Sequence, residues 1–233
     1  MKITAALLLI AASAPLCASS RAAVLAGWTF ESSQPAGPGP YAPDFGLVSP
    51  SLGAARLVHA NPAAAYSSPS GNGSAHSFSS DHWTVGDYYE FTTSTIGYRY
   101  ITFYWDQASS SRGPRDFSVQ YSADGVTFFP AWPYQVQADS PPLPRWNPVT
   151  ASGLYSYELS GSVAALENKS KVYFRLVLDS STSVSGGIIT DSSETRVDNV
   201  MIIAWGVVPS PGGLALVSLA ATTPTRRRRD PAA

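Results

Sequence analysis

The chain has 233 residues, a formal net charge of −1 and a single cysteine; 13% of its residues are charged and 44% are hydrophobic. One cysteine excludes a disulfide-stapled scaffold, and a charge near zero argues against a nucleic-acid-binding protein, which needs a basic surface. The length predicts one domain or two small ones, and the 12% aromatic content argues against a disordered chain.

The first 22 residues predict a secretory signal peptide. A basic residue precedes an apolar run over 5–15, and Ser20 and Ala22 occupy the −3 and −1 positions of the expected cut. The apolar run is too short to span a bilayer, and a buried N-terminal helix is the alternative. Since Cys17 lies in the removed segment, the mature chain is expected to contain no cysteine, which suits any oxidising compartment.

Residues 23–207 predict one all-β domain. In 100–106, for example, Ile101, Phe103 and Trp105 alternate with polar residues and share one face, which is the period of a half-buried strand. The other expected strands are 27–31, 89–92, 117–122, 172–179 and 200–204.

Turn signals separate these strands. Asp124-Gly125 predicts a hairpin after 117–122, and the best helical candidate, 163–168, is only about one and a half turns long. Segments rich in Pro, Gly and Ser are expected to be loops: 32–56, 61–75, 107–116, 138–153 and 180–195. Short strands joined by such long connections predict an antiparallel β-sandwich.

Several segments resemble galactose-binding-like jelly rolls and carbohydrate-binding modules. Residues 117–125 resemble a strand and turn of such jelly rolls, and 174–176 followed by 196–202 resemble their last two strands. Residues 28–31 are similar to the first strand of several carbohydrate-binding modules of this fold. The resemblance implies a jelly-roll-like sandwich.

In many related modules, an acidic residue after the first strand and an Asp that opens the last strand share a structural Ca²⁺. The matching residues here are Glu31 and Asp198. Calcium takes about six to eight oxygen ligands, and the first and last strands are adjacent in such a sandwich. The alternative is that Asp198 caps a turn or pairs with Arg196, while Glu31 is simply exposed.

Aromatic residues in the expected loops are the candidate ligand-binding residues. Aromatic faces stack on the C–H faces of sugar rings, and neighbouring polar groups fix the orientation of the sugar. The alternative is that these rings only cover the edges of the sandwich. The candidates, with polar partners from the 107–116 loop, are Trp132, Tyr134, Trp146, Arg112, Arg115 and Asp116.

Signals for catalysis are weak. No nucleophile elbow, phosphate-binding glycine loop or zinc-binding helix motif occurs in the sequence. The three histidines allow a Ser-His-Asp triad without supporting one, and His76 and His82 are expected to be ordinary loop residues. Carboxylates available for glycoside hydrolysis are Asp87, Glu90, Asp106, Asp116 and Asp124.

The C-terminal segment, 208–233, resembles the PEP-CTERM sorting signal of secreted bacterial proteins. An apolar stretch over 214–221 separates its two motifs, and the matching residues are Val208, Pro209, Pro211, Gly212, Arg226, Arg227, Arg228 and Arg229. The resemblance implies cleavage by an exosortase-type membrane protease and transfer to the cell surface. Ser210 replaces the usual Glu, and the apolar stretch has eight residues, whereas spanning takes roughly 20. A plain basic tail is the alternative.

The sequence therefore predicts a secreted or cell-surface, non-catalytic binding protein, with extracellular polysaccharide as the expected ligand. Two alternatives stay open: a structural protein of the envelope or biofilm matrix without a discrete ligand, and a glycan hydrolase. Residues 23–207 contain nine basic and fifteen acidic residues, a net charge of −6, which strengthens the exclusion of nucleic acid.

Overall fold

The computed structural model describes residues 22–159, 161 and 163–208. The expected signal peptide up to residue 21 lies outside the described residues. So do Pro209, Pro211, Gly212 and the four arginines of the expected sorting signal, Arg226, Arg227, Arg228 and Arg229. Within the described part, no helix is long and apolar enough to cross a bilayer.

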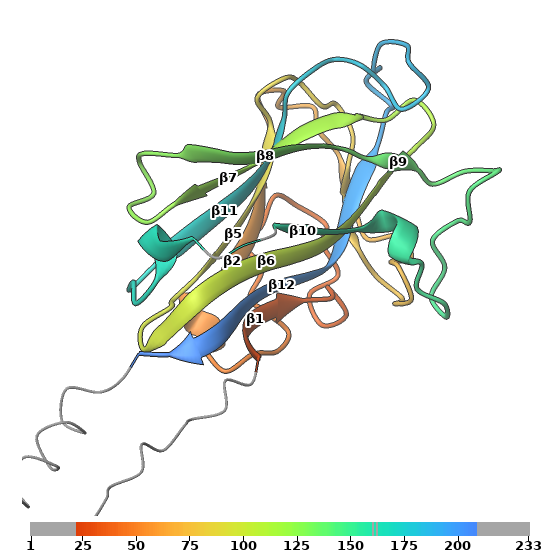
Figure 1. Cartoon of the computed structure of the whole chain (residues 1–233). Coiled ribbons are helices and arrows are strands. Elements are labelled where there is room, and N and C mark those ends of the chain that lie inside the picture. Colours follow the sequence, from red (N-terminus) through yellow and green to blue (C-terminus); the bar gives the residue numbers. More distant parts are fainter. Residues whose placement is uncertain (1–21, 160, 162, 209–233) are drawn as a thin grey trace, which may run out of the picture.

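The described chain forms two β-sheets that pack face to face (Figure 1). The larger sheet has the order β10-β6-β12-β4-β3, with β1 paired to β12 and β9 paired to β6. Its strands are β1 (Ala23–Trp28), β3 (Tyr66–Ser67), β4 (Phe78–Ser80), β6 (Tyr98–Ser109), β9 (Gln137–Ala138), β10 (Ser156–Leu159) and β12 (Thr195–Val207).

The smaller sheet has five strands in the order β2-β5-β11-β7-β8, and every pair in it is antiparallel. Its strands are β2 (Ala54–Val58), β5 (Tyr88–Thr93), β7 (Asp116–Ser122), β8 (Phe129–Gln135) and β11 (Val172–Leu178). In the larger sheet only the short β6–β9 pair is parallel. The predicted fold class, an all-β antiparallel sandwich, is confirmed.

Aromatic side chains from the two sheets form the core between them. The rings of Phe103 on β6 and Phe174 on β11 are stacked, with centroids 4.6 Å apart. The ring centroid of Phe91 on β5 lies 5.7 Å from that of Phe103 and 5.4 Å from that of Trp28 on β1. All four side chains are fully buried. Removing one such ring costs about 3–5 kcal/mol, so these contacts fix how the sheets sit on each other.

Several predicted elements are confirmed. Ile101, Phe103 and Trp105 face the core, Asp124-Gly125 joins β7 to β8, and the first and last strands pair, with Ala23 opposite Ala204. Three-residue 3₁₀ turns are the only helical structure among the described residues, at Pro50–Leu52, Gly153–Tyr155 and Ala164–Leu166. The last of these lies inside the helical candidate.

Several boundaries are wrong: β2 and β6 extend into the expected loops 32–56 and 107–116, and both terminal strands begin earlier than predicted. The last strand begins at Thr195 rather than at residue 200, because β4 pairs with its polar start through Ser80 opposite Thr195 and Phe78 opposite Val197. The first strand begins at Ala23 and ends at Trp28, four residues earlier at its start than predicted. Phe30 has φ of +59°, outside the extended region, which accounts for the early end.

Candidate functional site

Strand alternation places a carboxylate on the outer face of the five-stranded sheet. Tyr89 and Phe91 point into the core and are fully buried, so Glu90 between them points outward. Glu90 is nevertheless only 1% exposed. Arg56 on β2 and Arg175 on β11 lie directly opposite it in the two flanking strands and cover it.

These three side chains form an ion-pair cluster that links three strands. Arg56 Nε donates a 2.8 Å hydrogen bond to Glu90 Oε1, and Arg175 Nε donates a 2.8 Å bond to Glu90 Oε2. Arg56 Nη2 also lies 2.7 Å from Oε1. Both carboxylate oxygens are therefore used within the protein, and the cluster cross-links β2, β5 and β11.

The Arg175 guanidinium is held flat by aromatic rings. Its Cζ lies 3.4 Å from the centroid of the Phe128 ring and 4.1 Å from that of Tyr88. Together with the bond to Glu90, these cation–π contacts fix the direction of the planar fork. Within the described part of the chain, the Nη groups of Arg175 have no hydrogen-bond acceptor.

A hollow of about 400 Å³ opens beside this cluster. It is lined by Pro40, Ala54, Arg56, Glu90, Thr92, Gly125, Lys171 and Tyr173. The Thr92 side chain is 4% exposed, and its hydroxyl has no partner among the described residues. Lys171 Nζ lies 5.2 Å above the Tyr173 ring. We call this surface, with Tyr88, Phe128 and Arg175 at its edge, the Glu90 face.

The β7–β8 turn forms one wall of the hollow. Gly125 has φ of +75°, and a Cβ atom built on it would lie 2.7 Å from Cζ of Tyr173. Only glycine therefore lets the turn pack directly against the tyrosine ring. The Asp124-Gly125 pair, which predicts the hairpin, also shapes this surface.

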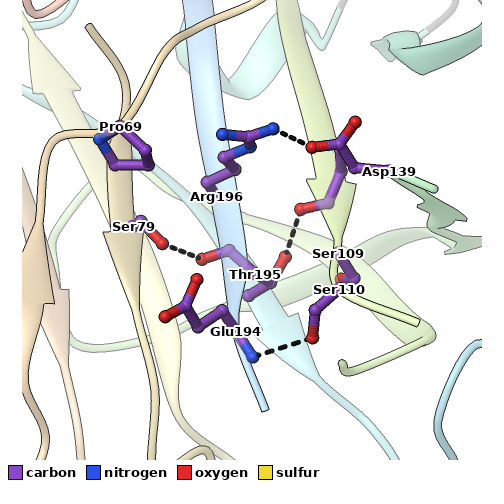
Figure 2. Close-up of a pocket in the computed structure, with 9 residues that line it drawn as sticks. Pro69, Ser79, Ser109, Ser110, Asp139, Glu194, Thr195 and Arg196 are labelled. Carbon is purple, nitrogen blue, oxygen red and sulfur yellow. Dashed lines mark hydrogen bonds and ion pairs between the residues drawn. The ribbon is translucent and has the colours of Figure 1, made fainter. Parts of the chain in front are cut away.

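A second, smaller pocket of about 150 Å³ lies over the seven-stranded sheet (Figure 2). Arg196 forms an ion pair with Asp139 there and donates a 2.8 Å bond to the carbonyl oxygen of Ser70. Burial lowers the pKa of Arg196 to about 10. Burial also raises the pKa of Glu194, which lines the same pocket. These contacts of Arg196 connect the 69–76 and 138–146 segments to β12.

The expected exposure of two aromatic candidates is wrong. Tyr134 is 6% exposed, and its hydroxyl donates to Gln107 Oε1 at 2.6 Å; Trp146 is 5% exposed and lies under the Arg196 guanidinium. Trp132 alone of the three is open, at 41%. The proline-rich segment around it is an edge strand, β8, where proline is tolerated, and alternation turns Tyr134 inward.

Two of the polar candidates of the 107–116 loop, Arg115 and Asp116, form an ion pair with each other. Arg115 Nε lies 2.8 Å from Asp116 Oδ1, and the pKa of Asp116 is lowered mainly by this arginine. Ser180 donates to Asp116 Oδ2 at 2.6 Å, which joins the segment after β11 to the start of β7. Arg112 is exposed between β6 and β7. None of these three residues lines the hollow on the Glu90 face.

The two predicted calcium ligands hold the same loop. Glu31 Oε1 accepts from the backbone N–H of His76 at 2.8 Å, while Asp198 Oδ2 accepts from the Asn72 N–H at 2.8 Å and from the Ser74 hydroxyl at 2.6 Å. The alternative pairing of Asp198 with Arg196 does not occur, because that arginine pairs with Asp139.

This donor arrangement does not fit a calcium ion as it stands. N–H and O–H groups face the carboxylate oxygens, whereas calcium needs oxygen lone pairs around it. The described residues contain no group of three or more acidic, histidine or cysteine side chains that could hold a metal. The calcium hypothesis therefore stays a prediction without support from the geometry.

A Ser-His-Asp constellation does occur. His59 Nδ1 lies 2.7 Å from Asp87 Oδ2, and His59 Nε2 lies 2.7 Å from Ser80 Oγ. Ser80 is 1% exposed, however, and its hydroxyl also lies 3.1 Å from the carbonyl oxygen of Asp81. A nucleophile has to reach its substrate, so this buried triplet serves as a hydrogen-bonded link between β4 and the ends of β2 and β5.

Comparisons with known proteins give structural similarity only. The fold and the Glu90 face define a β-sandwich domain with an open, charged and aromatic sheet face. No protein-family model matches the sequence, and no curated protein matches it.

Solved structures with a similar fold include three surface or binding domains. The K2 cleaved adhesin domain of Lys-gingipain has a TM-score of 0.42 and 13% identity, over 76% of this chain and 97% of that one. TmCBM61 in complex with β-1,4-galactotriose has a TM-score of 0.35 and 8% identity, over 64% and 88%. The N-terminal cellulose-binding domain of Cellulomonas fimi β-1,4-glucanase C has a TM-score of 0.31 and 9% identity, over 69% and 93%. Similarity at this level carries no functional conclusion for the present chain.

Proposed function

We propose that this β-sandwich is a non-catalytic module that binds a polysaccharide on the Glu90 face. The observation that carries the proposal is the hollow of about 400 Å³, whose lining combines an aromatic ring with fixed charged groups.

The chemistry of the lining suits a sugar ring. The half-buried Tyr173 lines the hollow, so the exposed part of its ring can contact the C–H groups of a sugar. The lysine ammonium and the arginine N–H groups donate to sugar oxygens, and the Glu90 cluster keeps the arginines in place. The face needs no catalytic group for this task, which favours binding over the hydrolase alternative.

The matched pair Tyr173→Ala and Trp132→Ala tests the proposal. Both remove an aromatic ring, but only Tyr173 lines the hollow, whereas Trp132 is exposed elsewhere on the edge strand β8. Binding is measured by affinity electrophoresis against a panel of neutral and acidic polysaccharides. We expect Tyr173→Ala to weaken retardation by about tenfold in apparent Kd, and Trp132→Ala to leave it unchanged.

Two results would count against the proposal. Failure of the wild-type domain to bind any polymer of the panel would favour the ligand-free matrix protein. A loss of binding in Trp132→Ala alone would move the site to β8.

Secretion and sorting are separate proposals that depend on the two ends of the chain. We propose export through the N-terminal signal and processing by an exosortase-type protease at the C-terminal segment. Mass spectrometry of the exported protein is expected to find an N-terminus at Ala23 and the loss of the arginine cluster. An intact C-terminus on the exported protein would reject the sorting proposal.

A further inference from the structure

We infer that the polysaccharide bound by the Glu90 face is anionic and carries carboxylate or sulfate groups, which Arg175 and Lys171 recognise. This inference rests on the proposed function and names the class of its ligand. It is carried by the way in which charge is distributed and neutralised on the face.

Positive charge is concentrated on this face. Residues 23–207 have a net charge of −6, yet three of their nine basic residues, Arg56, Lys171 and Arg175, belong to the Glu90 face. Of their fifteen acidic residues, only Glu90 lines the hollow. The basic groups outnumber the acidic ones on this face of an acidic domain, which favours anions there.

The single carboxylate offsets only one of the three positive charges. Glu90 is 1% exposed, and both of its oxygens already accept hydrogen bonds from arginines. Asp124, beside the hollow on the β7–β8 turn, is also used internally: its Oδ1 accepts from the N–H groups of Val126 and Thr127, each at 2.8 Å. These bonds lower the pKa of Asp124 to about 2. Asp124 is therefore ionised and offsets one more positive charge, but its Oδ1 is bonded within the turn, and the three cations still leave the face with a net positive charge.

Arg175 presents a prepared fork. Its Nε is bonded to Glu90, its plane lies against Phe128 and Tyr88, and its Nη groups have no acceptor among the described residues. A fixed guanidinium with free Nη groups matches the two oxygens of a carboxylate or sulfate. A neutral hydroxyl group gains less from this fork, because hydrogen bonds between a guanidinium and a charged acceptor are stronger than those to a neutral one.

Lys171 supplies a second cation next to the ring that would carry the sugar. Its ammonium lies 5.2 Å above Tyr173 and makes no ion pair with a described residue. An ammonium with three donors suits an anionic group that changes position along a polymer, whereas the Arg175 fork suits a defined one. Lys171 lines the hollow, and Arg175 lies opposite Glu90 on the same face, so an extended chain that fills the hollow and continues past Glu90 would meet both.

The test compares polymers that differ only in charge. Wild-type protein is titrated calorimetrically with polygalacturonate and with its fully methyl-esterified form, and separately with dextran sulfate and dextran. We expect at least about tenfold tighter binding to one anionic polymer than to its neutral partner, and weaker binding at 0.5 M than at 0.05 M NaCl. The two pairs distinguish carboxylate from sulfate as the recognised group.

Variants locate the effect. Lys171→Gln and Arg175→Gln are each expected to lower affinity for the anionic polymer by about fivefold or more and to reduce the salt dependence. Arg112→Gln, which removes an exposed cation outside the hollow, is the matched control and is expected to change nothing. Lys171 supports no ion pair, so its variant stays informative even if Arg175→Gln destabilises the Glu90 cluster.

The outcomes separate the inference from the proposed function. Equal affinity for charged and neutral polymers, abolished by Tyr173→Ala, would overturn the inference and leave polysaccharide binding intact. Binding to single-stranded DNA as tight as to the acidic polysaccharides would also overturn it, because the face would then be a general polyanion surface. Absence of binding to all four polymers and to every polymer of the wider panel would overturn both.

Discussion

Two buried carboxylates, Glu90 and Asp198, are stabilised in opposite ways. Glu90 is paired with two arginines from neighbouring strands. Asp198 is fully buried on β12 and receives only neutral donors, the N–H groups of Asn72 and Asn199 and the hydroxyl of Ser74. Burial consequently raises the pKa of Asp198 to about 7.

This difference in hydrogen-bond donors distinguishes two roles: the Glu90 cluster belongs to a binding surface, whereas the hydrogen bonds around Asp198, which we call the clasp, hold a loop in place. Around Glu90 each guanidinium donates its Nε–H to the carboxylate, and the Nη–H groups of Arg175 are available to a ligand. Around Asp198 the donors serve to fix the 69–76 loop, with Asn72 also donating from Nδ2 to Asp106 Oδ2 at 2.8 Å. We therefore expect substitutions at the first cluster to affect binding and stability, and those at the second to affect stability alone.

The largest expected effect is on the pH dependence of stability through Asp198. Because its folded-state pKa is raised, the folded protein keeps a proton between about pH 4 and pH 7 that the unfolded chain releases. This contribution is fully present below about pH 4 and is lost as the pH rises to about 7. The shift corresponds to an upper limit on the order of 4 kcal/mol.

Thermal melts of wild type and Asp198→Asn across pH 4–8 measure this effect. The difference in Tm between the two proteins is expected to change across this window, and binding at the Glu90 face is expected to stay the same. Parallel curves would show that Asp198 is ionised in the folded state throughout.

The next largest effect is expected for Glu90→Ala. It leaves two arginines next to each other without their shared carboxylate, so the free energy of unfolding is expected to fall by about 3 kcal/mol. Urea denaturation measures the change. Glu158→Ala is the control; its carboxylate accepts a single exposed hydrogen bond from Tyr104, and its loss is expected to cost less than about 1 kcal/mol. Equal losses would mean that the Glu90 cluster contributes no more than a surface contact.

A smaller effect is expected for Asn72→Ala at the clasp. Asn72 donates to Asp106 and to the Ser152 carbonyl and accepts from the Ser152 N–H at 2.7 Å, so its loss is expected to cost about 2 kcal/mol. Hydrogen exchange is expected to rise in the 69–76 loop and to stay unchanged in β5 and β11. Faster exchange across the five-stranded sheet would contradict the separation of the two clusters.

The smallest effect concerns calcium. The resemblance to carbohydrate-binding modules predicts a higher Tm in Ca²⁺ than in chelator for wild type, and no such difference for Glu31→Ala. The hydrogen bonds around Asp198 make any gain small. Identical Tm values under both conditions in wild type would reject the calcium hypothesis.

The local sequence pattern predicts the strands and the hairpin turn of this fold well. The alternation in 101–105 fixes which side chains face the core, because strand period is a local property. Asp124-Gly125 predicts the hairpin for the same reason, since glycine allows the positive φ that the turn needs.

The candidate site depends on pairing between distant strands, which local pattern does not contain. Glu90 lies 34 residues from Arg56 and 85 from Arg175, and only the register of β2, β5 and β11 brings them together. The proline-rich surroundings of Tyr134 and Trp146 suggest exposed loops, yet edge-strand pairing and the Arg196 contact bury both rings. One available signal was an isolated acidic residue between two core aromatics in 89–91.

The most direct test of the central claim is a two-dimensional amide NMR titration of the wild-type domain with tetragalacturonate. The account predicts that the shifted signals cluster on the Glu90 face, at Arg56, Thr92, Gly125 and Tyr173, while Trp132 and the 138–146 segment stay unchanged. Shifts confined to Trp132 and β8 would contradict it, and so would the absence of shifts with both tetragalacturonate and a sulfated oligosaccharide at millimolar concentration.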